Sequence, residues 1–226
     1  MRNDALTLRS NVFRDGSPDA DRFDDVAIHL VLRNEGGDVL ATCRLLAFST
    51  GQEIANSYSA QFYDLTKLSK VKGPCLELGR FCVAAHVSDP SVLRTLWTHI
   101  TTFVLEGRIE LLFGCSSFFA RDPTEILDAL SFLKENHTGP TQYLPGTQAR
   151  DIIHFDALPP CSDRPGALRQ IPPLLKTYLR MGGWVSDHAV IDRDLRTIHV
   201  FTGVEIAKIP PARRKALLRD AGHPPV

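Results

Sequence analysis

Residues 75–85 read CLELGRFCVAA, a run in which apolar side chains alternate with Glu77 and Arg80. The alternation predicts a long strand with one buried face. Glu77 and Arg80 stand three positions apart, so they fall on opposite faces of a regular strand unless a bulge at Gly79 brings them together. Bulges are common beside active sites. The structural alternative, a salt-bridged pair on a half-exposed strand, is equally consistent with this pattern.

A helix and a hairpin are predicted ahead of this strand. Residues 5–14 place Leu8 and Val12 on one helical face, and Gly16, Ser17 and Pro18 end the helix. Residues 27–33 and 39–48 are rich in β-forming residues and flank the turn cluster NEGGD, which predicts a hairpin. A polar, loop-like segment then leads to residue 75. Arg44 lies inside the apolar second strand of the hairpin, where a charge needs a carboxylate partner or a ligand.

Helices and strands alternate after residue 85. Two helices are predicted from N-cap signatures, Asp89 with Pro90 and Asp122-Pro123 with Glu125, and a short buried strand at 110–114 separates them. A long connection at 137–165 contains one further strand at 152–155. The remaining predicted elements are a helix at 172–181, strands at 189–191 and 197–204, and a basic helix opening at Pro210. This order predicts an α/β (α+β) fold with a mixed sheet, as one domain at 1–204 and a basic C-terminal helix and tail at 205–226.

Composition excludes several classes of protein. The 226 residues include 43% hydrophobic ones, which is ample for a core, and the 26 basic residues balance 26 acidic ones. Dedicated nucleic-acid binding needs a basic excess that the chain lacks. Five cysteines without paired spacing indicate free thiols in a reducing compartment, and no apolar segment approaches the length of a membrane span. We expect a cytoplasmic protein that is at most peripheral to a membrane.

Charge is unevenly distributed along the chain. Residues 1–64 carry 6 basic and 10 acidic side chains, whereas residues 164–226 carry 11 basic and 5 acidic ones. The acidic cluster DRFDD at 21–25 is, by itself, typical of a solvated loop. No metal-binding histidine pattern and no glycine-rich nucleotide loop occurs. Cys115 has no histidine near it in sequence, so a packed thiol is favoured over a nucleophile.

Five motifs in order suggest a family. They are Phe23-Asp24, ATCRLL at 41–46, LELGR at 76–80, LFGCSSF at 112–118 with Asp122-Pro123, and PPLLKTYLRMG at 172–182. This series closely resembles the bacterial L-ornithine N-alpha-acyltransferases, which make lyso-ornithine lipid and belong to the GNAT-like acyltransferases. The resemblance spans about residues 5–210. It is more distant to the acyl-homoserine-lactone synthases, whose key positions fall on Arg9, Phe13, Asp21, Asp24, Arg44, Glu77 and Arg80.

The resemblance implies a GNAT-like fold, a mixed central sheet flanked by helices. It further implies transfer of a 3-hydroxyacyl group from acyl carrier protein to the alpha-amino group of ornithine, with no other cofactor. Family members carry a strand ahead of the segment that matches residues 8–13, so the first strand of the fold is expected to be missing here. His199 also stands where an acidic residue is expected.

The chemistry of such a reaction assigns roles to particular side chains. A thioester is already activated, so an enzyme must position the amine, remove its proton and stabilise an oxyanion. Glu77 is the candidate base and Arg80 its catalytic neighbour, whereas Asp21, Asp24, Arg44 and Arg9 are candidates for binding the amino acid. A backbone N–H at a strand bulge is expected to stabilise the oxyanion.

The donor and its docking surface follow from charge. Residues 85–90, AHVSDP, lack the glycines of a phosphate-binding loop, so a carrier protein suits this chain better than free coenzyme A. Acyl carrier proteins are acidic, and Lys176, Arg180 and Arg169 are the candidate docking cations, with the anionic inner membrane as another partner. The alternatives left open are an acyl-homoserine-lactone synthase, an acyltransferase for another amino acid, and a non-catalytic binding module.

Overall fold

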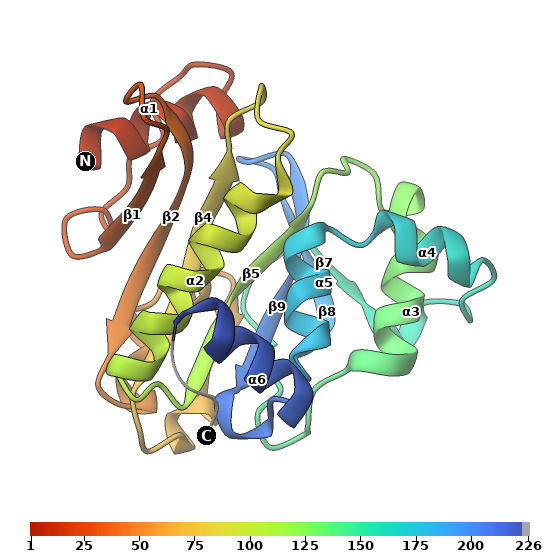
Figure 1. Cartoon of the computed structure of the whole chain (residues 1–226). Coiled ribbons are helices and arrows are strands. Elements are labelled where there is room, and N and C mark those ends of the chain that lie inside the picture. Colours follow the sequence, from red (N-terminus) through yellow and green to blue (C-terminus); the bar gives the residue numbers. More distant parts are fainter. Residues whose placement is uncertain (223–226) are drawn as a thin grey trace.

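A seven-stranded mixed sheet forms the centre of the protein in a computed structural model that describes residues 1–222 (Figure 1). Its strands lie in the order β1-β2-β4-β5-β9-β8-β7. Their bounds are β1 Ile28–Arg33, β2 Val39–Phe48, β4 Cys75–Val83, β5 Leu111–Phe118, β7 Ile152–His154, β8 Trp184–Asp192 and β9 Thr197–Glu205. The prediction of an α+β fold with a mixed sheet is confirmed.

Strands β4 and β5 run parallel, whereas the other neighbouring strands of this sheet, within residues 1–222, are antiparallel. A parallel pair needs a crossover, and helix α2 (Pro90–Glu106) supplies it. The helix begins as predicted, with the Asp89 carboxylate accepting a hydrogen bond from the Ser91 N–H at 2.8 Å. Its buried stripe of Val92, Leu96, Ile100 and Val104 packs on the sheet.

Helices cover one face of the sheet. Figure 1 shows α2, α5 and α6 in front of the central strands, with α3 and α4 to one side. Their bounds are α3 Leu127–His137, α4 Arg164–Gln170, α5 Pro173–Arg180 and α6 Pro211–Asp220. Helix α6 packs on α2, where the Thr98 hydroxyl reaches the Asp220 carbonyl, and Leu217 joins the core beneath. The domain boundary at 204/205 stays a prediction, and residues 223–226 lie outside the described ones.

The opposite face is covered by the segment between β2 and β4, which the sequence suggested to be a polar loop. It folds into three short 3-10 turns, Gly51–Asn56 (η1), Ser59–Gln61 (η2) and Thr66–Lys70 (η3). Strand β3 (Tyr63–Asp64) lies among them and pairs with β6 (Gly146–Thr147). Ile54, Tyr63 and Leu68 are fully buried on this face. Because these apolar residues have neither a helical nor a strand period, sequence patterning missed them.

Strands β5 and β8 are longer than predicted, and helix α4 was not predicted; β8 begins at Trp184 rather than at residue 189. Strand β5 continues past residue 114 to Phe118, because its Gly-Cys-Ser-Ser stretch pairs with β9 from Thr202 to His199. Tertiary pairing overrides the weak strand propensity of those residues. Helix α4 lies beyond the long connection and is capped by the Asp163 carboxylate.

Helix α1 (Arg2–Phe13) confirms the predicted N-terminal helix, and β1 forms one edge of the sheet in the described chain. The helix packs across β1, β2 and β4 (Figure 1). Ala5, Leu8 and Arg9 are its buried residues. An arginine buried there requires partners, and the loop between α1 and β1 supplies them.

Candidate active site

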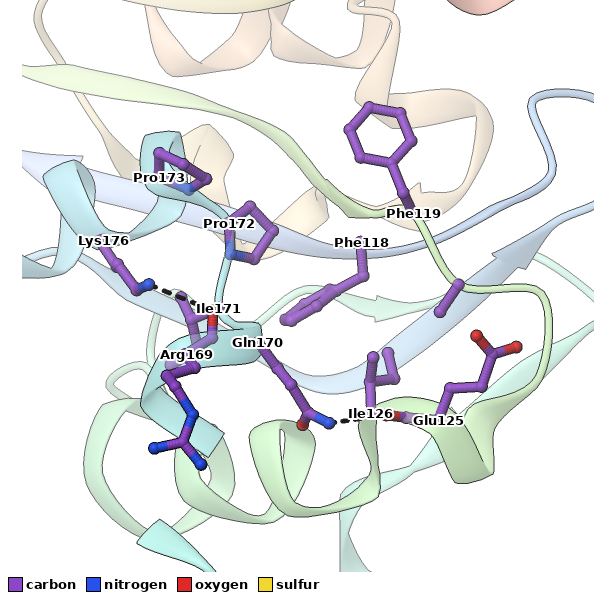
Figure 2. Close-up of a pocket in the computed structure, with 11 residues that line it drawn as sticks. Phe118, Phe119, Glu125, Ile126, Arg169, Gln170, Ile171, Pro172, Pro173 and Lys176 are labelled. Atoms are coloured by element: carbon purple, nitrogen blue, oxygen red, sulfur yellow. Dashed lines mark hydrogen bonds between the residues drawn. The ribbon is translucent and has the colours of Figure 1, made fainter. Parts of the chain in front are cut away.

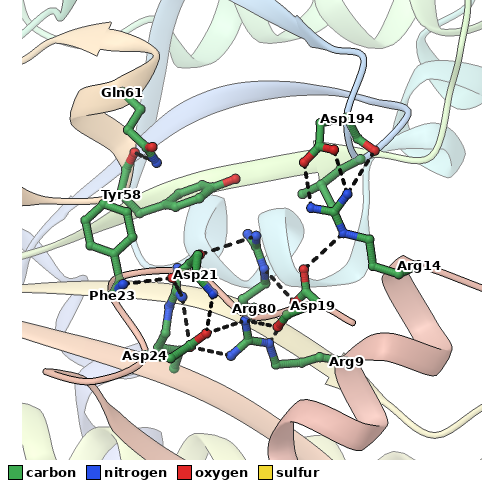
Figure 3. A network of polar contacts seen from close by, with 12 residues as sticks. Arg9, Arg14, Asp19, Asp21, Phe23, Asp24, Tyr58, Gln61, Arg80 and Asp194 are labelled. Atoms are coloured by element: carbon green, nitrogen blue, oxygen red, sulfur yellow. Dashed lines mark hydrogen bonds and ion pairs between the residues drawn. The ribbon is translucent and has the colours of Figure 1, made fainter. Parts of the chain in front are cut away.

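Arg9 lies at the centre of a buried network of ion pairs between α1, the loop after it, and strands β2 and β4 (Figure 3). Its side chain is 1% exposed. Nε donates to the Asp19 carboxylate at 2.8 Å, and Nη1 donates to the Asp24 carboxylate at 2.6 Å. A buried guanidinium is tolerated only when its donors are paired in this way, so Arg9 fixes the loop against the helix.

Arg44 and Arg80 complete the network from the sheet. Arg44 donates to Asp21 at 2.6 Å and to Asp24 at 3.0 Å. Arg80 donates to Asp19 at 3.0 Å. Burial alone would raise the pKa of Asp24, but hydrogen bonds from Arg9, the Asp21 amide and Arg44 hold it well below the usual range. The acidic cluster is therefore a buried set of paired carboxylates, and the interpretation as a solvated loop fits Asp25 alone, which is largely exposed.

Asp21 differs from the other carboxylates of the network. Its side chain is 25% exposed, and its Oδ2 atom accepts no hydrogen bond within residues 1–222. The Arg80 guanidinium lies 3.6 Å from that oxygen. Asp21 is therefore the member of the network with capacity for a further donor.

The Tyr58 ring packs against the two arginines that the sheet contributes to the network. The guanidinium carbon of Arg80 lies 4.7 Å from its centroid, and that of Arg44 lies 5.4 Å from it. Both distances allow cation–π attraction. The Phe23 ring packs edge-on to it at 5.7 Å. Tyr58 follows the η1 turn, and no sequence pattern singled it out.

Glu77 is buried beside this ring with 3% of its surface exposed. Its carboxylate accepts three hydrogen bonds, from the Tyr58 N–H at 2.8 Å, the Ser59 N–H at 2.7 Å and the Ser59 hydroxyl at 2.5 Å. Burial raises the pKa of Glu77, and the bonds from Ser59 and Tyr58 partly oppose this rise. Glu77 makes no ion pair with Arg80 in the described chain, so the salt-bridge alternative is wrong.

A bulge does bring Glu77 and Arg80 to the same face, one residue later than predicted. Gly79 pairs with Arg44 and Cys82 with Thr42, so Arg80 and Phe81 both lie opposite Cys43. Arg80 has a φ of 49°, a left-handed conformation that is uncommon outside glycine. The extra residue turns Phe81 toward the helix-side core and leaves Arg80 on the face of Glu77.

Strands β4 and β5 separate directly after Glu77. Their parallel pairing covers three positions and ends at Glu77 opposite Phe113. Next on β5 is Gly114, where an added Cβ atom would lie 2.3 Å from the Leu78 carbonyl oxygen. Beyond this contact the β5-facing backbone of residues 79–81 has no strand partner in the described chain. Glu77 and the bulge therefore lie where the two strands stop pairing, which makes this position the candidate site.

Cys115 lies on β5 at this separation, with its sulfur 3.4 Å from the Ser59 hydroxyl. Burial and the nearby Glu77 raise the pKa of this thiol far above neutrality, although the Ser59 bond opposes the rise. A thiol that stays protonated is a poor nucleophile. The interpretation of Cys115 as a packed thiol therefore agrees with its environment.

His199 occupies the position where the sequence resemblance leads one to expect an acid. It lies on β9 opposite Ser117, and its Nδ1 atom is 3.1 Å from the Tyr63 hydroxyl. Burial and the neighbouring His188 lower the pKa of His199 to about 3. The imidazole is therefore neutral at physiological pH and adds no charge to the site.

A surface groove lies at the far end of β5 (Figure 2). Its cavity is about 420 Å³. Apolar residues from β5 and the start of α5 line it, together with Arg169 and Lys176. Phe119 stands at its rim with 79% of its surface exposed. Of the three predicted docking cations, Arg169 and Lys176 line this groove, whereas Arg180 is exposed in the last turn of α5.

Within residues 1–222, no cluster of three or more His, Cys, Asp and Glu side chains could hold a metal ion. In the same range, no helix is long and apolar enough to cross a membrane. The structure brings the predicted catalytic and substrate-binding residues together in one region: Glu77, Arg80, Asp21, Asp24, Arg44 and Arg9. Their individual roles stay predictions. Sequence reasoning missed Asp19, Tyr58 and Ser59, of which only Asp19 had a signal, its place beside the acidic cluster.

Comparisons with known proteins identify relatives. Residues 8–98 match the family model described as an acetyltransferase (GNAT) domain. An L-ornithine N(alpha)-acyltransferase of Rhodobacter capsulatus is 35% identical over 80% of this chain and 72% of its own length. The protein of the same name from Brucella abortus is 33% identical over 84% of this chain and 71% of its own length. Among solved structures, the N-acyl amino acid synthase FeeM from uncultured soil microbes matches this chain with a TM-score of 0.52 and 12% sequence identity. The match covers 91% of each chain and shows that the two proteins share the fold.

Proposed function

The chain belongs to the L-ornithine N(alpha)-acyltransferase family, and on this premise we propose that it transfers a 3-hydroxyacyl group from acyl carrier protein to the alpha-amino group of L-ornithine. The product would be lyso-ornithine lipid. The observation that carries the proposal is the buried Glu77 carboxylate at the point where β4 and β5 separate. A site of this form can hold an extended thioester between two strands and a base beside it.

Glu77 is proposed as the general base. A carboxylate has about four lone-pair positions, and the three hydrogen bonds leave one of them free on Oε2. That atom can accept a proton from the alpha-ammonium group, directly or through one water. The raised pKa of Glu77 makes it a stronger base than an exposed glutamate. Attack by the neutral amine forms the C–N bond, and the nitrogen loses a second proton as the C–S bond breaks and the amide forms. One of the two protons goes to the leaving thiolate and the other is released to solvent.

The oxyanion of the tetrahedral intermediate needs N–H donors that are fixed before the reaction. The bulge at Arg80 and Phe81 offers backbone groups without a strand partner on the β5 side. We propose that one of these N–H groups binds the oxyanion. Arg80 would contribute by keeping the bulge in its left-handed conformation through its bond to Asp19 and its contact with Tyr58.

The amino-acid acceptor is proposed to bind against the ion-pair network. Asp21 is the proposed direct contact, because its side chain is partly exposed and its Oδ2 atom, although buried in the free protein, has no hydrogen-bond donor within residues 1–222 and could accept one from an ammonium group. Three members of the network are almost fully buried and paired, namely Asp24, Arg9 and Arg44. Their proposed contribution is to hold Asp21 and the loop in place. An acyl-cysteine intermediate is not part of the proposal, since the Cys115 thiol stays protonated.

The groove at the end of β5 is the proposed docking surface for the carrier protein. Arg169 and Lys176 supply positive charge, Arg180 extends it, and the exposed Phe119 supplies an apolar anchor. Cys115 and Phe118 are three residues apart, so the groove begins roughly 10 Å along the strand from the reaction site. The same cations could also hold the protein against the anionic inner membrane, which vesicle sedimentation with and without anionic lipid would measure.

The proposal is tested by incubating the protein with 3-hydroxyacyl carrier protein and L-ornithine and measuring the products by mass spectrometry. The expected product is N-alpha-acylated ornithine and free carrier thiol in equal amounts. Competing acceptors, lysine and S-adenosylmethionine, are added at equal concentration to test the choice of amino acid. An intact protein that acylates none of the acceptors would contradict an enzymatic role, and acyl-homoserine lactone as the main product would contradict the acceptor.

A further inference from the structure

Ser59 is a fully buried polar residue for which the reaction as proposed has no role. It is the first residue of the η2 turn, in the segment that covers the sheet face opposite the helices. Its hydroxyl donates to Glu77 Oε1 at 2.5 Å, and its N–H donates to the same oxygen at 2.7 Å. Two donors from one residue therefore occupy one oxygen of the candidate base.

The same hydroxyl reaches the second strand of the site. Its oxygen lies 3.4 Å from the Cys115 sulfur on β5. Glu77 is the last β4 residue that pairs with β5, and Cys115 lies two positions beyond its partner Phe113. The Ser59 side chain thus connects β4 and β5 where their backbone hydrogen bonding stops. The buried hydroxyl is satisfied by its bond to Glu77, and the contact with Cys115 ties the same group to β5.

We infer that Ser59 is a positioning residue for Glu77: its hydroxyl keeps Oε1 occupied and turns Oε2, with its free lone pair, toward the acceptor amine. The inference rests on the proposed function of Glu77 as the base. It adds a residue that touches neither substrate and that acts through the orientation and ionisation of another side chain.

Ser59 also affects the charge of Glu77. A hydrogen bond to a carboxylate favours its ionised form, so the Ser59 hydroxyl holds the pKa of Glu77 below the value that burial alone would set. The other charged or titratable groups around Glu77 are Arg44 from β2, Cys115 from β5 and Tyr178 from α5, together with Tyr58 in the covering segment and Arg80 beyond the bulge. Ser59 is neither charged nor titratable, so its hydroxyl can be removed without changing the charge of the site.

The test compares Ser59→Ala with Ser57→Ala. Ser57 is equally buried in the same segment, and its oxygen accepts a hydrogen bond from the Ala60 N–H at 3.2 Å rather than contacting Glu77. Both variants lose one buried hydroxyl. In Ser59→Ala we expect the acid limb of the kcat/KM profile to move to higher pH, with about a tenfold lower kcat/KM on that limb and recovery at alkaline pH. Ser57→Ala should keep the wild-type profile.

A second measurement does not need turnover. The Glu77 side-chain carboxyl is titrated by ¹³C NMR in protein labelled at glutamate, with Glu77→Gln to assign its signal. Ser59→Ala is expected to raise the pKa of Glu77, whereas Ser57→Ala leaves it unchanged. An unmoved titration and an unmoved acid limb in Ser59→Ala would overturn the inference, even if the melting temperature falls. If the titration moves but wild-type protein makes no acyl-ornithine, the positioning role stands and the proposed function fails.

Discussion

At the scale of single residues, the environment of Glu77 explains how one carboxylate can serve both structure and chemistry. Three donors from Tyr58 and Ser59 bind it, which fixes the segment that covers the second face of the sheet. One lone pair is left for a proton. Because this side chain has both tasks, a substitution there affects stability together with activity, and the two effects must be measured separately.

Glu77→Gln replaces one oxygen by an amide NH₂ that would point at a backbone N–H donor. We expect the free energy of unfolding to fall by about 1–3 kcal/mol, because one buried donor loses its acceptor. Acyltransferase activity should fall at least about 100-fold, the contribution typical of a general base. Denaturant titration and product assays measure the two effects. Glu53→Gln is the matched control, since Glu53 also accepts a backbone N–H, from Ser49, on the exposed surface. Retained activity in Glu77→Gln would remove Glu77 as the base.

At the scale of elements, the site depends on how β4 and β5 part. The bulge at Arg80 and the close approach of Gly114 to Leu78 both occur within four residues of Glu77 along the two strands. A bulge changes which face the following residues occupy, and the absence of a side chain at Gly114 lets the strands touch before they separate. The point at which the two strands separate is therefore set by backbone features at two positions.

Gly114→Ala tests this dependence. Its Cβ atom would lie 2.3 Å from the Leu78 carbonyl oxygen, a backbone atom that cannot move without shifting β4. We expect a loss of stability of about 1–3 kcal/mol and a matching loss of activity. Gly79→Ala is the control, because an added Cβ there meets no atom within 4 Å. Calorimetry that finds the two variants equally stable would contradict the close-approach argument.

At the scale of the whole molecule, part of the acidic charge near the N-terminus is buried in ion pairs, whereas the basic charge after residue 164 lies mainly on the surface. Three of the ten acidic residues in 1–64, Asp19, Asp21 and Asp24, form ion pairs with arginines of the network or at its edge, namely Arg9, Arg14, Arg44 and Arg80. The basic residues after 164 lie largely on the surface, and two of them line the groove at the end of β5. The interior therefore carries paired charges that shape a site, whereas the groove carries exposed positive charge, of which Arg169 makes only a long ion pair of 3.9 Å with the exposed Asp163.

Charge reversal in the groove separates docking from chemistry. For Lys176→Glu and Arg169→Glu we expect KM for acyl carrier protein to rise about tenfold or more at low salt, because like charges then face an acidic partner. The kcat with a small acyl thioester should stay at the wild-type value. Raising the salt concentration should reduce the difference between variant and wild type. Lys70→Glu, an exposed position in η3 ahead of β4, is the control. A KM for carrier protein that is insensitive to both groove variants would exclude this surface as the docking site.

Local signals explain why most elements could be predicted. Three signals are encoded within a few residues: the alternation of residues 75–83, the Asp89-Pro90 cap of α2, and the capping box of Asp122 with Glu125. All three are present, but the capping box begins a 3-10 turn at Pro123–Ile126 (η4), and α3 starts after it at Leu127. The cover formed by η1, η2 and η3 was not predictable, because its buried residues follow no period. The bulge was inferred from the spacing of Glu77 and Arg80, yet its position at Arg80 depends on the register of β2 against β4.

The sequence by itself determined the order of helices and strands, the caps, and the set of charged residues that cannot be left unpaired in an apolar strand or helix. Only the tertiary structure decided their partners. Asp19 pairs with Arg80 across 61 positions, and Ser59 meets Glu77 and Cys115 across 18 and 56. The physical reason is that secondary structure follows from neighbours along the chain, whereas a buried side-chain hydrogen bond requires two distant segments to meet within about 3 Å, which strand register and loop packing alone can fix.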